Sequence, residues 1–253
     1  MNLEKCMQMS IAVVLLAALL SPVVLAQQQA VDWARYNGVP GNWNYVEQTQ
    51  LNKENIKYLE MKWVYPIPSS PTTNPFLSGA EGVIHTPLVY KGVVYFVTNW
   101  HRVYAVDAAT GKTLWTRDLP PPAELADKII KGEAPWQVPG ALRGHFHQVS
   151  IYELDGRAYM FIATNYWYLF ALDVFTGDIK LNYTVFSTDY LANVPGNRGA
   201  YDVSTPSLII DTKRKIMVTG VSTSESQAAG RGFFVGVDLK PWLEGRGSPQ
   251  IIW

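Results

Sequence analysis

The 253-residue sequence has almost no cysteine, little histidine and no excess of charge of either sign. It contains one cysteine, four histidines, and 21 basic residues that balance 21 acidic ones. Because Cys6 is the sole cysteine, the remainder of the chain forms no internal disulfide and has no cysteine-based metal site. The balanced charge gives no indication of nucleic acid or an anionic membrane surface as a partner.

The sequence also lacks an uninterrupted apolar run long enough to cross a membrane. The run Ile11–Ala26 has 16 residues and is broken by Pro22, whereas a spanning helix needs roughly 20 apolar residues. Lys5 lies in the short polar start, and Val24-Leu25-Ala26 has small residues where signal peptidase needs them. We expect residues 1–26 to be a cleaved signal peptide. The protein is then periplasmic or extracellular, and it contacts the membrane only if the segment stays uncleaved.

Aromatic residues and turn formers are abundant. The sequence is 13% aromatic, with 9 Trp and 14 Tyr, and it contains 19 Gly and 16 Pro. This composition favours an all-β architecture with many tight turns.

A repeat is the strongest internal pattern. Residues 104–115 read Tyr-Ala-Val-Asp-Ala-Ala-Thr-Gly-Lys-Thr-Leu-Trp, and residues 170–181 read Phe-Ala-Leu-Asp-Val-Phe-Thr-Gly-Asp-Ile-Lys-Leu. A degraded third copy begins at Val235 and reaches Trp253 after an insertion that removes the Thr-Gly. The aspartates fall at 107, 173 and 238, which gives a period of 66 and then 65 residues.

Each copy predicts a strand that ends at the aspartate, a turn at the glycine, and a second short strand. Further strands are expected ahead of each aspartate, at 86–90 and 93–98, 148–154 and 158–164, and 207–211 and 216–221. Four strands per repeat predict the blades of a β-propeller. A β-sandwich is the alternative, but it does not require the same string at equal intervals. One helix is expected, at 122–131.

The string from Ala105 to Trp115 resembles the tryptophan-docking motif of quinoprotein dehydrogenases that carry pyrroloquinoline quinone (PQQ). The beginning of the chain is also similar to this family, through Trp33, the stretch 48–57 and Trp63-Val-Tyr65. The resemblance implies that Trp115 packs between neighbouring blades. It also implies that residues 31–253 form roughly three blades of an eight-bladed ring.

The resemblance also implies site residues. Arg143 matches an arginine whose guanidinium contacts the quinone oxygens. Ser222 and Thr223 match the cofactor-binding part of a Gly-x-Ser-x-x-Glu pattern, and Glu225 matches the metal ligand. A carboxylate suits Ca²⁺ or a lanthanide ion, because both are hard cations that prefer oxygen. The alternative is a solvated loop arginine for Arg143 and a serine-rich surface hairpin for the segment that contains Ser222 and Glu225.

The implied function is an exported PQQ-dependent alcohol dehydrogenase. It would oxidise a small alcohol by hydride transfer to the quinone and pass electrons to cytochrome c or another acceptor. The catalytic base and the remaining ligands are expected beyond Trp253, so the fragment alone is expected to be inactive. The alternative is a non-catalytic propeller of the same repeat that acts as an envelope scaffold or interaction protein. Arg143, Ser222 and Glu225 favour the enzyme, because a scaffold has no need of cofactor residues.

The sequence departs from the family pattern in two places that bear on the site. A quinone-contacting glutamate of the first blade falls near Ile84 or His85, and Glu81 replaces it only with a shift. Between Glu225 and Arg231 the chain has two residues more than the usual pattern. The four histidines, at 85, 101, 145 and 147, are expected to be ordinary hydrogen-bonded side chains rather than a metal site.

Overall fold

The computed structural model describes residues 32–35, 38, 44–45, 48, 50–67, 81–83, 85–98, 101–120, 149–163, 168–185, 207–221 and 233–253. The predicted signal peptide and the predicted helix at 122–131 lie outside these residues.

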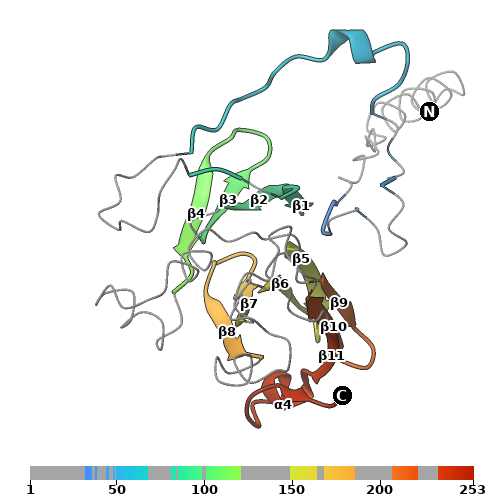
Figure 1. The fold of residues 1–253 in the computed structure, drawn as a ribbon. Coiled ribbons are helices and arrows are strands. Elements are labelled where there is room, and N and C mark those ends of the chain that lie inside the picture. Colours follow the sequence, from blue (N-terminus) through green and yellow to red (C-terminus); the bar gives the residue numbers. More distant parts are fainter. Residues whose placement is uncertain are drawn as a thin grey trace, which may run out of the picture. The chain divides into compact units, whose positions relative to one another are not determined.

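Twelve of the described segments are strands, and they form three four-stranded antiparallel sheets (Figure 1). Blade 1 consists of β1 (Leu88–Tyr90), β2 (Val93–Val97), β3 (Arg102–Asp107) and β4 (Thr113–Asp118). Blade 2 consists of β5 (Val149–Leu154), β6 (Arg157–Ala163), β7 (Tyr168–Asp173) and β8 (Ile179–Thr184). Blade 3 consists of β9 (Ser207–Asp211), β10 (Ile216–Val221), β11 (Phe233–Asp238) and β12 (Gln250–Ile251). In each sheet the strands pair in chain order, which confirms the predicted four-stranded units.

Helical structure is scarce in the described residues. It comprises a 3-10 turn, η1 (Ile56–Tyr58), and one short helix, α4 (Lys240–Leu243). In this part of the chain no helix has the length and apolarity needed to cross a membrane. Strand therefore dominates, as the composition predicts.

The three repeat aspartates occupy equivalent places at the ends of β3, β7 and β11. The side-chain oxygen of each accepts a backbone N–H from the turn that follows: Asp107 from Thr110 at 2.8 Å, Asp173 from Thr176 at 3.0 Å, and Asp238 from Lys240 at 3.0 Å. In the third copy, α4 replaces the Thr-Gly turn, with Pro241 in its first turn, where a missing N–H costs nothing.

Trp115 joins blade 1 to blade 2. Its indole Nε1 donates to the Val174 carbonyl at 3.1 Å, and its ring lies flat against Gly177 in the β7–β8 turn. A Cβ built on Gly177 would lie 2.6 Å from the indole, and the φ of this glycine is +70°. Glycine is therefore required at this position for two reasons: the turn needs a positive φ, and the indole ring leaves no space for a Cβ atom. The contact confirms the inter-blade packing implied for Trp115.

Two apolar cores lie between the blades. The core between blades 1 and 2 includes Tyr95, Val103 and Ala105 of blade 1, together with Met160 and Phe170 of blade 2. The core between blades 2 and 3 is built in the same way from Phe161, Leu169, Met217 and Val237, among others. The two central strands of blade 2, β6 and β7, are thus covered on both faces, which explains their nearly continuous apolar sequences.

The extended segment 61–67 covers the other face of blade 1. Its odd-numbered side chains, Trp63, Tyr65 and Ile67, pack against the buried residues Phe96, Tyr104 and Val106. The indole Nε1 of Trp63 donates to the Ala108 carbonyl at 2.9 Å. The even-numbered residues of the segment are exposed.

Candidate functional site

In each blade, the connection between the first two strands and the connection between the last two strands lie at the same end of the sheet. The Lys91 ammonium in the β1–β2 turn lies 3.1 Å from the Glu153 carboxylate of blade 2. Lys215 in the β9–β10 turn pairs with Asp155 in the β5–β6 turn. The Trp115 contact with Val174 joins the β3–β4 and β7–β8 regions at this end as well. We call it the turn end, and the opposite end, where β4 and β10 finish, the loop end.

All four predicted site residues, Arg143, Ser222, Thr223 and Glu225, lie outside the described residues. The strands that flank them are described. The connection that contains Arg143 leaves from the end of β4 and returns at the start of β5, and the connection that contains Ser222 leaves β10 and returns to β11. All four of these strand termini lie at the loop end. That Arg143, Ser222 and Glu225 lie close together therefore stays a prediction. The directions of the flanking strands agree with it, because both connections lie at the loop end.

The described part of the loop end contains a buried polar network in blade 1. The Glu81 side chain is fully buried, and it accepts a hydrogen bond from Thr98 Oγ1 at 2.7 Å and from Arg102 Nη1 at 3.2 Å. Arg102 Nε in turn donates to the exposed Asp118 carboxylate at 2.7 Å, which raises the pKa of the guanidinium. A buried carboxylate needs such hydrogen-bond partners in place of water.

Both oxygens of the Glu81 carboxylate have hydrogen-bond partners in this network. One of its oxygens binds Thr98 and the other binds Arg102. Glu81 therefore connects the 81–83 segment to the β2–β3 turn and, through Arg102, to the end of β4. Each carboxylate oxygen has two lone pairs, so these hydrogen bonds leave acceptor capacity on both oxygens. Within blade 1 the two hydrogen bonds give Glu81 a structural role.

Two histidines belong to the same end of blade 1. The backbone N–H of Val97 donates to His85 Nε2 at 2.7 Å, so the proton is on Nδ1, which donates to the Thr86 carbonyl at 2.8 Å. Burial lowers the pKa of His85, and it lowers the pKa of buried His101 to about 4. Both imidazoles are therefore neutral at pH 7. His85 is an ordinary hydrogen-bonded histidine, as expected; His145 and His147 lie outside the described residues.

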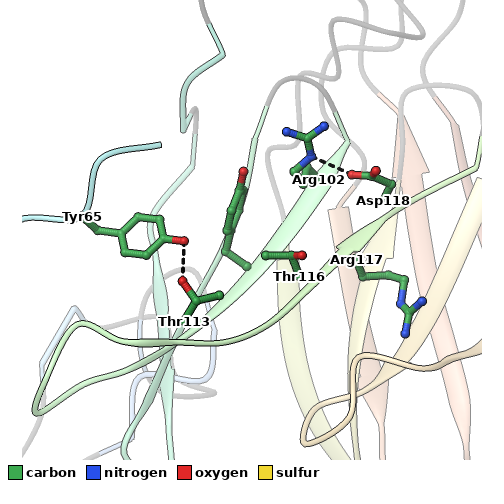
Figure 2. A pocket seen from close by; sticks show the side chains of 7 residues that line it. Tyr65, Arg102, Thr113, Thr116, Arg117 and Asp118 are labelled. Atoms are coloured by element: carbon green, nitrogen blue, oxygen red, sulfur yellow. Dashed lines mark hydrogen bonds and ion pairs between the residues drawn. The ribbon is translucent and has the colours of Figure 1, made fainter. Parts of the chain in front are cut away.

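A hollow of about 620 Å³ opens on blade 1 next to this network (Figure 2). Hydroxyl and guanidinium groups dominate its lining, which consists of Tyr65, Arg102, Tyr104, Thr113, Thr116, Arg117 and Asp118. The Tyr65 hydroxyl and Thr113 Oγ1 share a hydrogen bond of 2.8 Å across it. Arg117 points toward blade 2, where its Nε donates to the Gly177 carbonyl at 2.7 Å. Both guanidinium groups in the lining thus have protein partners.

Sequence reasoning missed the network and the hollow. The strand register was a usable signal for the network. Ala105 pairs with Trp115 in β3 and β4, so counting three residues outward along both strands pairs Arg102 with Asp118. No comparable signal exists for Glu81, because its segment is not in a strand of the repeat. Among the described residues, no three His, Cys, Asp or Glu side chains form a metal-binding group.

Comparisons with known proteins agree with the repeat and the strand order. The family described as PQQ, the β-propeller domain of glucose, ethanol and alcohol dehydrogenases, matches residues 33–240. The dehydrogenase subunit of a quinone-type alcohol dehydrogenase from Gluconobacter oxydans is 30% identical over 237 residues, which is 87% of this chain and 26% of the relative. The quinohemoprotein alcohol dehydrogenase ADH IIB from Pseudomonas putida is 31% identical over 173 residues, 64% of this chain and 21% of the relative.

Solved structures show the same fold. The quinohemoprotein alcohol dehydrogenase from Comamonas testosteroni superimposes with a TM-score of 0.55 at 21% identity, over 88% of this chain and 27% of that one. The chain thus spans between 13% and 26% of the length of the first four curated relatives. Because the family match covers most of the sequence, the chain belongs to the PQQ β-propeller domain family of glucose, ethanol and alcohol dehydrogenases.

Proposed function

We propose that this chain is the first part of the propeller of an exported PQQ-dependent alcohol dehydrogenase, an oxidoreductase. The family match over residues 33–240 carries the proposal. The strand directions support it, because they send the connections that contain Arg143 and Ser222 to the same end of their blades. The antiparallel chain order of each four-stranded sheet dictates this arrangement.

Each predicted residue has a role that its chemistry suits. The Arg143 guanidinium would stabilise negative charge that develops on a quinone oxygen, because a fixed cation in a dry site interacts strongly with such charge. The Ser222 and Thr223 hydroxyls would donate hydrogen bonds to a cofactor carboxylate. Glu225 would supply one oxygen ligand to Ca²⁺ or a lanthanide ion. The bound quinone would supply the hydride acceptor, which no amino-acid side chain provides.

The substrate class and the electron acceptor follow from the relatives. They include quinone-type and quinohemoprotein alcohol dehydrogenases, and one from Thauera butanivorans, 30% identical over 131 residues, is a 1-butanol dehydrogenase (cytochrome c). We therefore propose a small alcohol as the substrate and cytochrome c or another redox protein as the acceptor. We also propose that the chain alone does not oxidise alcohol, because it covers only 26% of the Gluconobacter oxydans relative.

Cofactor binding tests the proposal without requiring turnover. Equilibrium dialysis of the chain against PQQ, with Ca²⁺ or La³⁺, should show saturable binding that needs the metal. Arg143→Ala and Glu225→Gln should each weaken it roughly tenfold or more, because a hydrogen bond to a charged group contributes about 1.5–3 kcal/mol. The matched controls are Arg246→Ala and Glu244→Gln, an exposed ion pair at the turn end, which should bind normally. If the site variants bind as well as the controls, the cofactor assignment is wrong and the scaffold hypothesis replaces it.

Export is a separate part of the proposal and rests on residues 1–26. N-terminal sequencing of the exported product should begin at Gln27. Intact Met1 on a membrane-bound product would instead show that the segment is an anchor.

A further inference from the structure

The first described residues of the chain contact both blade 1 and blade 2. Trp33 forms an antiparallel bridge with Val89 of β1: the Trp33 N–H donates to the Val89 carbonyl at 2.7 Å, and the Val89 N–H donates to the Trp33 carbonyl at 2.9 Å. The next residue contacts blade 2, where the Ala34 carbonyl accepts the Ile151 N–H of β5 at 2.8 Å. Two consecutive residues thus join strands of different sheets.

Side chains add a contact to each blade. Asp32 Oδ1 accepts the backbone N–H of Lys91, in the β1–β2 turn, at 2.7 Å. The Arg35 guanidinium lies 4.3 Å from the centre of the Tyr152 ring of β5, which is a cation–π contact. Between them, Ala34 packs against the core that the two blades share. Residues 32–35 therefore bind blade 1 at one end and blade 2 at the other.

A tight turn completes this segment. The Gly38 N–H donates to the Arg35 carbonyl at 3.0 Å, and the φ of Gly38 is +81°. A Cβ on Gly38 would lie 2.9 Å from the Trp33 ring, so the ring packs directly on this glycine. Residues 32–35 and 38 are thus a local unit with its own turn, which we call the strap.

The strap lies where the first strands of the two blades meet. β1 contacts β5, as β5 contacts β9. Each of these first strands has one neighbour within its own sheet, so its other edge can pair with a further segment. The strap covers this edge of β1 at Val89 and this edge of β5 at Ile151.

Fewer bonds hold the strap than hold the strands that it joins. β1 pairs with β2 over three residue pairs, and β5 pairs with β6 over six. Among the described residues, the strap backbone makes two hydrogen bonds to β1 and one to β5. Segments with few hydrogen bonds and few buried contacts open at a lower free energy than the whole domain. The strap is therefore the part of this interface that opens first.

We propose that the strap is a conformational lock between blades 1 and 2, which opens and closes as one unit while both sheets stay folded. Its seat is a binding site for an extended peptide along the edges of β1 and β5. The occupant that this chain supplies is Asp-Trp-Ala, residues 32–34. The lock is separate from the cofactor site, and it does not depend on the function proposed above.

Native-state hydrogen exchange of the chain tests the lock, because neighbouring amides of β5 point in opposite directions. The Ile151 N–H bonds to the strap, so in an antiparallel ladder the Tyr152 N–H faces β6. Val89 and Ile151, which both bond to the strap, should share one protection factor. We expect it to be at least about tenfold lower than that of Tyr152, because only the strap has to open.

A proline in the strap tests whether it opens as one unit. Trp33→Pro removes the N–H that bonds to Val89. It should also speed the exchange of Ile151 roughly tenfold, although Trp33 makes no bond to that residue. Trp33→Phe keeps the N–H and an aromatic ring, and it is the matched control in which Ile151 should stay protected.

A peptide tests whether the seat is a binding site. The peptide with the sequence of residues 27–38, added at millimolar concentration to the Trp33→Pro chain, should restore the protection of Ile151. The same peptide with Trp33→Pro is the matched control and should give no protection.

Three results would overturn the proposal. The first is equal protection of Val89, Ile151 and Tyr152 in the unchanged chain, which would mean that the strap opens only with the sheets; this comparison decides even if Trp33→Pro does not fold. The second is faster exchange of Val89 alone in Trp33→Pro, which would show that the contacts with the two blades are independent. The third is equal protection of Ile151 by the unaltered peptide and by its proline variant.

Discussion

The two outermost faces of the three blades differ in what covers them. On the blade 1 side, the segment 61–67 covers Phe96, Tyr104 and Val106, all of which are buried. On the blade 3 side, Phe234 is 65% exposed, although its equivalents Val103 and Leu169 are 0% and 1% exposed. The repeat thus places an apolar residue at this position in each blade, and only a following blade buries it. Burial in this fold depends on the neighbour, as in other repeat proteins.

The tryptophans should show the largest consequence of this difference. Trp115→Ala removes an indole that packs against the core between blades 1 and 2, and we expect a loss of about 3 kcal/mol in the free energy of unfolding. Trp253→Ala changes an equivalent residue that is 60% exposed, and we expect a change within about 0.5 kcal/mol. Urea denaturation followed by circular dichroism measures both. Equal losses would mean that the exposed face of blade 3 is covered in solution.

A glycine pair separates the contact with the tryptophan from the cost of the turn. Gly177 and Gly156 both have positive φ, at +70° and +75°, but a Cβ on Gly156 meets nothing within 4 Å. We expect Gly156→Ala to cost about 1 kcal/mol for the backbone alone. Gly177→Ala should cost about 2 kcal/mol more, because the Trp115 ring must move. Similar values for the two variants would show that the ring moves without strain.

Acid should destabilise blade 1 rather than blade 3, because all four histidines precede residue 207. The pKa of His101 is about 4 in the folded chain against 6.5 for the free side chain, so the folded state binds fewer protons below pH 6.5. Stability should therefore fall as the pH drops from 6.5 toward 4, by on the order of 2 kcal/mol, and His85 should add to the loss. Unfolding free energies measured between pH 7 and 4 test this, and His101→Asn should flatten the slope.

The smallest change in stability is expected on the bare face of blade 3. Phe234→Ser removes apolar surface that is already in water, so the free energy of unfolding should change by less than about 0.5 kcal/mol. Binding of the dye ANS and aggregation on storage should both decrease. Unchanged dye binding would show that this face is not the main apolar surface of the chain.

The sequence predicted the blades well because their strands are local patterns. β9 and β10 have the predicted bounds, and Asp107, Asp173 and Asp238 are equivalent as the spacing indicated. It did not predict α4, because that helix replaces the turn in the one copy that lost its Thr-Gly. For Trp63, the sequence predicted only that it lies in a strand near the beginning of the chain. Its packing on Gly111 was not predicted, because the two residues are far apart in the sequence.

The site was predictable only through the resemblance to the family. Arg143, Ser222, Thr223 and Glu225 lie in connections between strands, and connections have no periodicity from which a position can be read. The partner of a buried carboxylate is equally hidden. Glu81 is hydrogen-bonded to Thr98 and Arg102, which belong to other segments of blade 1. The local sequence around any one of these residues does not predict that they lie together.

The docking of each tryptophan on the next blade also has a consequence for how the chain is made. Trp115 reaches a carbonyl 59 residues further along the chain, and Trp63 reaches one 45 residues further. During synthesis, the indole of an outer strand therefore stays uncovered until the following repeat has emerged from the ribosome. Contacts at such separations form slowly, and unpaired edges remain exposed meanwhile. Chaperones and proteases in the cell therefore first encounter each blade with one face exposed, before the next blade covers it.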